Sequence, residues 1–286
     1  MKSTWMLVAG FLFALMGVLV KLASERFSSP ELVFYRSLFG LLSIYIVIVA
    51  TYRQWLAPLA TRHATGHAWR GLSGFVALVM YFYGIAHLPL ATAITLNYTS
   101  PLFLAVLTAW WLKERHGHGL AAAVVIGFAG VALLLRPGWG GEDMTARLIG
   151  LVSGVLAAVA YLNVRALGRE GEPEWRVVFY FTLIATIGGG IWMAGAGFVV
   201  PRLADLPLLL FMGATGTLGQ LAMTRAYRLG NTLAVGALAY STVGFAALYG
   251  VILGDRPPLV AWVGMLLIVL AGLLSVRASR SVAAPE

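Results

Sequence analysis

Residues 86–115, AHLPLATAITLNYTSPLFLAVLTAWWLKER, contain the stretch that decides the fold of this chain. The stretch opens with a short turn at His87-Leu88-Pro89 and then runs apolar to a charged end at Glu114-Arg115. A helix needs about 20 mostly apolar residues to cross a membrane, which this run supplies. Pro101 lies in its middle, where the ring cannot donate a backbone hydrogen bond and bends a helix. The stretch therefore predicts a kinked transmembrane helix.

The composition of the whole chain excludes a soluble protein. Of its 286 residues, 60% are hydrophobic and 11% are charged, with a mean hydropathy of +0.87. Soluble domains have about 45–50% apolar and about 25% charged residues. The net charge of +9 comes from Lys and Arg in short loops, so it indicates membrane topology rather than nucleic-acid binding. The absence of Cys excludes disulfides and thiol chemistry, and we expect no metal site and no cofactor.

Charged and turn residues divide the chain into ten apolar runs, which predict ten transmembrane helices in an all-α integral membrane protein. Lys and Arg are more frequent on the side of the amino terminus, so we expect both termini in the cytoplasm. The third and fourth runs meet at so short a turn that they should form an antiparallel hairpin. The runs span about 3–23, 33–51, 69–87, 92–112, 119–136, 147–165, 177–198, 206–224, 232–253 and 259–276.

A second stretch repeats the first one. Residues 227–256, YRLGNTLAVGALAYSTVGFAALYGVILGDR, align with 86–115, each with a short break, a span of small residues and a terminal acid–Arg pair. Phe34-Tyr35 likewise aligns with Phe179-Tyr180. We expect two five-helix repeats, 1–140 and 141–286, the second with a short cytoplasmic tail. Because five is odd, the second repeat must be inverted, an arrangement typical of secondary transporters with a substrate site near the midplane.

The hairpin, the fourth span with Pro101, the terminal Glu114 and the Gly130-Val131 pair near the end of the fifth span resemble the EamA-type family of the drug/metabolite transporter superfamily. The resemblance covers all ten spans and occurs twice, although Thr242 and Asp255 stand where the second half would have proline and glutamate. It implies a central cavity surrounded by spans 1–4 and 6–9, with the fifth and tenth outside. Members of that family move small metabolites, and many export amino acids or related compounds, with aromatic amino-acid exporters among them. The resemblance also implies the bacterial inner membrane.

Polar, aromatic and sulfur-containing side chains inside the apolar runs are the candidate substrate contacts. Such a lining suits a zwitterion with an apolar side chain, although each of these side chains could instead pack between helices. The predicted contacts are Met80, Tyr83, Asn97, Tyr98, Ser100, Tyr161, Asn163, Trp192, Gln220, Met223, Tyr240 and Ser241. The predicted hinge residues are Pro101, Gly236 and Gly244, because proline and glycine weaken a helix locally.

Lys21 and Arg36 are the basic residues placed well inside predicted runs. They could attract a carboxylate at the outer mouth, or their long side chains could reach the membrane interface. Glu114 and Asp255, at the ends of spans four and nine, suit helix capping or loop order. No Asp or Glu lies deep in a predicted span, so a carboxylate proton relay is not expected.

The sequence thus predicts a secondary transporter that exports small metabolites by alternating access, most favourably amino acids with aromatic or apolar side chains. It has no phosphate-binding loop, which excludes direct drive by ATP. A broad exporter of drugs or lipophilic cations is the first alternative, and an integral membrane enzyme or a channel are further ones. The expected partners are a small-molecule substrate and the lipid bilayer without nucleic acid, and monomer and homodimer both stay open.

Overall fold

The computed structural model describes all residues except 1, 55–56, 112–117, 135–143, 231 and 283–286. Within the described residues every regular element is a helix, and three short 3-10 helices accompany the α-helices. The 3-10 helices are η1 (Lys2–Thr4), η2 (Ala57–Leu59) and η3 (Leu203–Asp205). The α-helices are α1 (Trp5–Ala23), α2 (Ser29–Tyr52), α3 (Ala64–His87), α4 (Leu90–Asn97), α5 (Ser100–Trp111), α6 (His118–Leu134), α7 (Met144–Arg169), α8 (Glu174–Ala196), α9 (Leu206–Leu229), α10 (Thr232–Ala239), α11 (Ser241–Ile252) and α12 (Leu259–Val282).

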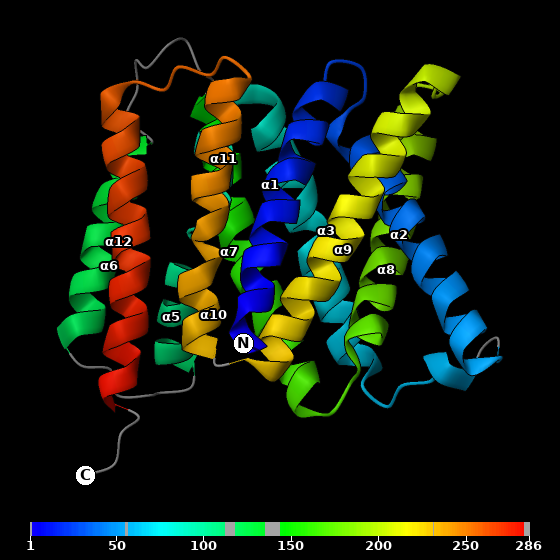
Figure 1. Ribbon diagram of the computed structural model, residues 1–286, viewed down its shortest axis with the longest axis horizontal. Coiled ribbons are helices and arrows are strands. Elements are labelled where there is room, and N and C mark those ends of the chain that lie inside the picture. The colour runs from blue at the N-terminus through cyan, green and yellow to red at the C-terminus, as the bar shows by residue number, and fades with distance from the viewer. Residues whose placement is uncertain (1, 55–56, 112–117, 135–143, 231, 283–286) are drawn as a thin grey trace.

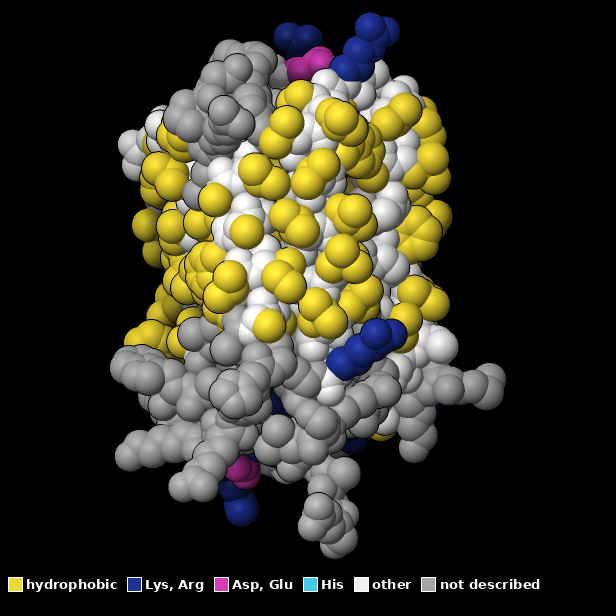
Figure 2. Space-filling model, turned by 90° about the vertical axis from the view of Figure 1, so that its left-hand side faces the viewer, with side chains coloured by type: hydrophobic (Ala, Val, Ile, Leu, Met, Phe, Trp, Pro, Cys, Tyr) yellow, Lys and Arg dark blue, Asp and Glu magenta, His cyan; other side chains and the backbone are white. Residues whose placement is uncertain are grey.

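The chain is a multi-pass membrane protein by the length and polarity of its helices. Six helical segments are long and apolar enough to cross a bilayer: α1, α2, α3, α7, α8 and the continuous segment Leu203–Leu229 that ends with α9. Figure 2 shows the consequence on the face formed by α6 and α12. Apolar side chains cover its middle, and the coloured charged side chains gather toward the two ends.

Each predicted apolar run coincides with one α-helix or with a pair of short ones. Several helices are longer than their runs, because polar residues continue the helix beyond the apolar core. Helix α3, for example, begins at Ala64 rather than at residue 69. Its first turns contain His67 and Arg70, which are both buried against neighbouring helices. The apolar run was therefore too strict a measure of where this helix begins.

The predicted kink in the fourth run is confirmed as a break between α4 and α5 at Tyr98-Thr99. Pro101 cannot donate to the carbonyl of Asn97, and Thr99 instead closes a tight turn onto Leu96 O at 3.3 Å. The ninth run is broken in the same way at Tyr240, between α10 and α11. That second break has no proline.

Two glycines let a neighbouring helix approach each break closely. A Cβ atom on Gly154 of α7 would lie 2.5 Å from Thr99 Oγ1 and 2.8 Å from Leu96 O. A Cβ atom on Gly10 of α1 would lie 2.7 Å from Thr242 Oγ1, beside the other break. Since these distances are shorter than van der Waals contact, both broken helices depend on a glycine opposite them.

The helices pack side by side with α6 and α12 at one edge and α2 and α8 at the other (Figure 1). Between these edges α1 packs on α9 and α3 packs on α7. The amino terminus and the last described turn of α12 lie at the same end of the molecule (Figure 1). The broken helices α4–α5 and α10–α11 pack on α7 and α1, so the interior is built from both halves of the chain.

Gly154→Ala should lower the stability of the protein, because the added methyl group collides with the α4–α5 break. Overpacking of this kind costs about 1–3 kcal/mol. Thermal unfolding of the purified protein in detergent measures the effect. The matched control is Gly168→Ala, also in α7, where an added Cβ meets nothing within 4 Å. Equal melting temperatures for the two variants would contradict the close approach of α7 to the break.

Candidate functional site

A cavity of about 60 Å³ lies among helices from both halves of the chain. Its lining comes from α1, α2, α3, α7, α8 and α9 and from the end of α4 at the first break, and no described side chain of α6 or α12 contributes to it. On α3 the lining residues recur every three to four positions, at Arg70, Gly74, Ala77 and Tyr81, which places them on one helix face. The full lining is Phe13, Met16, Arg36, Arg70, Gly74, Ala77, Leu78, Tyr81, Asn97, Tyr98, Ala157, Ala160, Tyr161, Phe181 and Gln220.

Two arginines are the dominant charges of this cavity. Arg36 of α2 is 1% exposed and Arg70 of α3 is 3% exposed. Arg36 Nη2 donates to Gly216 O at 3.2 Å, and Arg70 Nη2 donates to Gln220 Oε1 at 3.3 Å. Both guanidinium carbons lie near one ring, that of Phe181, at 5.4 Å and 4.2 Å from its centroid.

Lys21 and Arg36, predicted from their place well inside the apolar runs, have further basic residues beside them in the interior. Arg70 and Arg147 are also buried within helices, at 3% and 1% exposure. Arg70 was missed because it stands at the edge of its apolar run, although α3 begins two turns earlier. Arg36 itself lines the central cavity rather than an outer mouth.

Burial of the two arginines lowers the stability of the fold. Neither guanidinium has a carboxylate partner among the described residues, and the buried atoms Arg36 Nε, Arg36 Nη1 and Arg70 Nε have no hydrogen-bond partner there. Burying an ion costs several kcal/mol, and a desolvated cation–π contact offsets on the order of 2 kcal/mol of that cost. Charges held inside a membrane protein at such cost mark a functional site by default.

Glycines make the room that the two guanidinium groups need. A Cβ on Gly216 of α9 would lie 2.6 Å from Arg36 Nε, and one on Gly74 of α3 would lie 2.1 Å from Arg70 Nη1. Any side chain at either position would push the arginine aside. The local sequence is therefore fitted to the placement of both cations.

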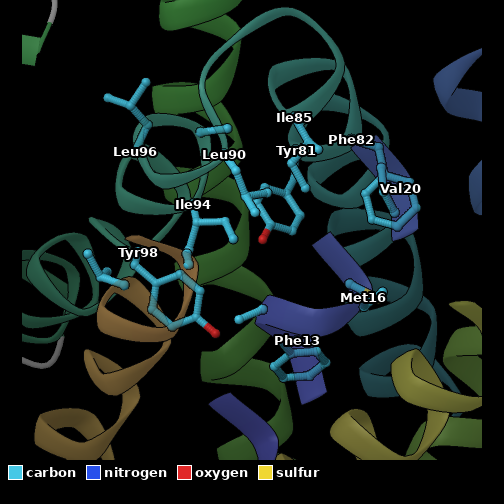
Figure 3. Close-up of a cluster of buried hydrophobic side chains, with 14 of the residues drawn as sticks. Phe13, Met16, Val20, Tyr81, Phe82, Ile85, Leu90, Ile94, Leu96 and Tyr98 are labelled. Atoms are coloured by element: carbon cyan, nitrogen blue, oxygen red, sulfur yellow. The ribbon is translucent and has the colours of Figure 1, made fainter. Parts of the chain in front are cut away.

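Tyrosines and an asparagine form the uncharged part of the lining. Tyr81 and Tyr98 extend their hydroxyl groups into the same space beside Phe13 (Figure 3). The buried Tyr81 hydroxyl has no hydrogen-bond partner in the described part of the chain. Asn97 Nδ2 donates to Ser153 Oγ at 2.9 Å, which links the α4 end of the break to α7. The cavity thus offers donors and aromatic faces together.

The structure brings four of the predicted substrate contacts to the cavity lining, namely Asn97, Tyr98, Tyr161 and Gln220. It places the others elsewhere. Met80 and Tyr83 lie on α3 beside the lining face, and Tyr83 stacks on His87. Ser100 and Met223 are buried outside the lining, and Ser241 donates to Leu238 O. Tyr240 packs against Gly272, Asn163 bonds to Val159 O beside a different hollow, and Trp192 is 56% exposed on the outer surface.

The predicted hinge residues surround the two breaks without all lying in them. Pro101 is in the first turn of α5, directly after the first break. Gly236 is buried in α10 and Gly244 is exposed in α11, so they flank the second break at Tyr240. An added Cβ on Gly244 would meet nothing within 4 Å, so no neighbouring helix requires a glycine there.

The other charged candidates bind backbone groups. Lys21 Nζ donates to Leu88 O at the turn between α3 and α4. Asp255 Oδ2 accepts from Leu90 N at 2.7 Å, so it caps the start of α4 from the other half of the chain. Glu114 lies outside the described residues.

Polar contacts between the two halves close both ends of the molecule. At one end Asp255 holds α4, Glu31 accepts from Val199 N, and Arg26 pairs with Asp205 at 3.2 Å. At the other end Thr61 Oγ1 donates to Glu172 at 2.6 Å, and Arg176 Nη2 donates to Pro58 O at 2.7 Å. Each end therefore has its own set of contacts that would have to break for the cavity to open there.

The carboxyl of Glu172 is held in its charged form. Burial opposes ionisation, but the bonds from Thr61 and Arg176 and the nearby His67 outweigh it and lower the pKa of Glu172 below its usual value. Arg176 also donates from Nη2 to Pro58 O at 2.7 Å, so the carboxylate holds the connection before α3 against α8. Among the described residues no group of three or more His, Asp or Glu side chains could hold a metal ion.

A family model, several sequence relatives and a solved structure match this chain over most of its length. The EamA-like transporter family model matches twice, over residues 2–136 and 144–277. The pseudopaline exporter CntI of Pseudomonas aeruginosa is 33% identical over 88% of this chain and 87% of that protein. A riboflavin transporter of Rhizobium johnstonii is 29% identical over 96% and 90%, and an S-adenosylmethionine uptake transporter of Rickettsia bellii is 23% identical over 81% and 77%. One crystal structure shares the fold with a TM-score of 0.67 at 18% identity, over 99% of this chain and all of the other.

Glu172→Gln should destabilise the protein at neutral pH, since charged hydrogen bonds of this kind contribute about 1.5–3 kcal/mol. Because the folded-state pKa is lowered, the stabilisation by Glu172 is complete above the usual value of 4.5 and is lost as the pH falls through the lowered pKa. Melting temperatures of both proteins across an acid pH series test this. The exposed Glu170→Gln, two residues away, is the control and should match the wild type. If the difference in melting temperature between wild type and Glu172→Gln grew on acidification, the stabilising role of the charged Glu172 carboxylate would be contradicted.

Proposed function

The chain belongs to the EamA-like transporter family, and on that premise we propose that it exports small carboxylate-bearing metabolites through the central cavity by alternating access. The observation that carries the proposal is a cavity lined by both halves of the chain, beside a broken helix and two buried arginines. Transporters bind their substrates at such places, where interrupted helices expose polar groups within the membrane. The family and its named relatives are transporters rather than enzymes.

We propose ten membrane crossings in two inverted repeats, residues 1–140 and 141–286. Helices α4 and α5 together would make one crossing, as would α10 and α11. The packing supports this, because exchanging the halves turns the most extensive helix pairs into observed ones: α1 on α9 becomes α7 on α3, while α2 on α8 and α6 on α12 map onto themselves. The double match of the family model supports the same division. Both termini would lie in the cytoplasm of a bacterial inner membrane.

The proposed cycle uses the contacts that join the halves at the two ends. Opening toward the end with Glu172 would break the Thr61–Glu172 and Arg176–Pro58 bonds while the contacts of Asp255 and Glu31 hold. Opening toward the other end would do the reverse. The breaks at Tyr98-Thr99 and Tyr240, rather than Gly244, would let the helices bend.

Amino acids with apolar or aromatic side chains are substrates of the proposed class, since the lining combines cationic donors with aromatic rings. Outward transport is supported by the exporters of pseudopaline among the relatives. A broad exporter of lipophilic cations is disfavoured, because the described lining contains arginines and no acid.

Uptake into proteoliposomes tests the proposed function. A panel of labelled carboxylates, with neutral and acidic amino acids included, should contain at least one whose uptake saturates and accelerates when the same compound is loaded inside. Uptake should need neither ATP nor a pH gradient. Non-saturating flux would indicate a channel instead. If a protonophore abolished accumulation of the substrate, transport would be coupled to protons, which would contradict this part of the proposal.

Tyr98→Ala should reduce that transport about tenfold or more, because the ring lies in the cavity lining beside the first break. Phe211→Ala, which removes a ring that is 51% exposed on α9, should leave transport unchanged. Equal loss in both variants would show that the cavity is not the transport site.

A further inference from the structure

We propose that the substrate carries a net negative charge and that Arg36 and Arg70 bind its carboxylate groups. This inference rests on the proposed function, because it takes the central cavity as the substrate site. It goes further in selecting anions over zwitterions and cations. A single amino acid is neutral overall at neutral pH, so the preferred substrates would have more carboxylates than ammonium groups.

The unpaired donors are the first support. A guanidinium has five N–H donors and no acceptor, so only an oxygen-bearing or anionic partner can satisfy it. Each arginine makes one long bond, to Gly216 O or to Gln220, while Arg36 Nε, Arg36 Nη1 and Arg70 Nε have no partner in the described part of the chain. A structural arginine normally has its donors engaged, whereas these two retain donors beside a cavity that both of them line.

The lining charges are the second support. Two cations and no carboxylate line the cavity as the structure describes it. An ammonium group of a bound zwitterion would meet two guanidinium groups and would have only neutral oxygens, such as those of Asn97, Gln220 and Tyr81, to accept from it. Like charges at close range in an apolar interior repel strongly, so a free ammonium group would weaken binding. The site therefore discriminates by charge.

The size of the cavity is the third support. An apolar cavity of about 150 Å³ is known to hold benzene, and a cavity of about 60 Å³ is much too small for a whole aromatic metabolite. It suits the head group of one. A carboxylate is flat and takes two parallel hydrogen bonds from a guanidinium, and two arginines can hold two such groups. The apolar remainder would lie among Phe13, Tyr98 and Tyr161 once the helices move apart.

Three compounds that share a benzyl group test the charge preference. They are benzylsuccinate with two carboxylates, phenylalanine as the zwitterion, and phenethylamine as the cation. Thermal stabilisation of the purified wild-type protein at constant chloride measures binding, and proteoliposome uptake measures transport. We expect benzylsuccinate to bind at least tenfold more tightly than phenylalanine and phenethylamine not to bind. Equal or tighter binding of phenylalanine or phenethylamine would overturn the inference.

Variants then test the arginines. Arg36→Met and Arg70→Met should abolish stabilisation by benzylsuccinate, while the ligand-free variants should melt at the wild-type temperature or above it, because a buried unpaired charge has been removed. Arg36→Lys keeps the charge without the paired donors and should weaken benzylsuccinate binding at least tenfold. The control is Arg53→Gln, an exposed position at the end of the same helix α2. Undiminished benzylsuccinate binding in the Lys or Met variants would overturn the assignment.

The proposed function and this inference fail in different ways. If the panel of carboxylates shows no saturable uptake, the proposed function fails. If uptake saturates but is carried by neutral or cationic compounds and is unaffected by the arginine variants, transport stands and the anion site is wrong. If chloride alone stabilises the wild type as strongly as benzylsuccinate does, the site binds simple anions rather than an organic substrate, which also overturns the inference.

Discussion

Two guanidinium groups held in an apolar interior, with no carboxylate partner among the described residues, are the constraint on which the rest of this structure depends. Such an arrangement is costly, and the surrounding sequence accommodates it at several points. Gly74 and Gly216 leave room for the side chains, and Phe181 presents its ring to both guanidinium carbons. The interior is therefore not simply the place where apolar helices meet. It contains two positive charges, which a bound anion would neutralise.

The backbone around the cavity is also built from both halves of the chain. Helices α4 and α10 end early, and each break is held by a helix from the opposite half that presents a glycine, Gly154 or Gly10. The halves are alike in this respect but not in their charges. The alignment of Phe34-Tyr35 with Phe179-Tyr180 sets Arg36 opposite Phe181, so the first half supplies the cation where the second supplies the ring. The two halves thus share the helix breaks but not the charges.

The fold was largely predictable from the sequence, because length and polarity alone mark helices in a membrane protein. The site was harder to predict. Where nearly every face of a helix is apolar, hydrophobic periodicity does not reveal which face points inward. Trp192 and Tyr98 were therefore both predicted as substrate contacts, although the structure exposes Trp192 and buries Tyr98. Arg70 was overlooked as a residue at the edge of a run. Its signal was present in the spacing of Arg70, Gly74, Ala77 and Tyr81, which a search for polar and small residues on one face would find.

An experimental structure of the protein with 4-bromobenzylsuccinate bound is the most direct test of this account, because bromine can be located by its anomalous scattering. The account predicts carboxylate oxygens within hydrogen-bond distance of the guanidinium groups of Arg36 and Arg70, with the ring among Tyr98, Tyr161 and Phe13. A ligand bound elsewhere, with both arginines paired to groups of the protein, would contradict it.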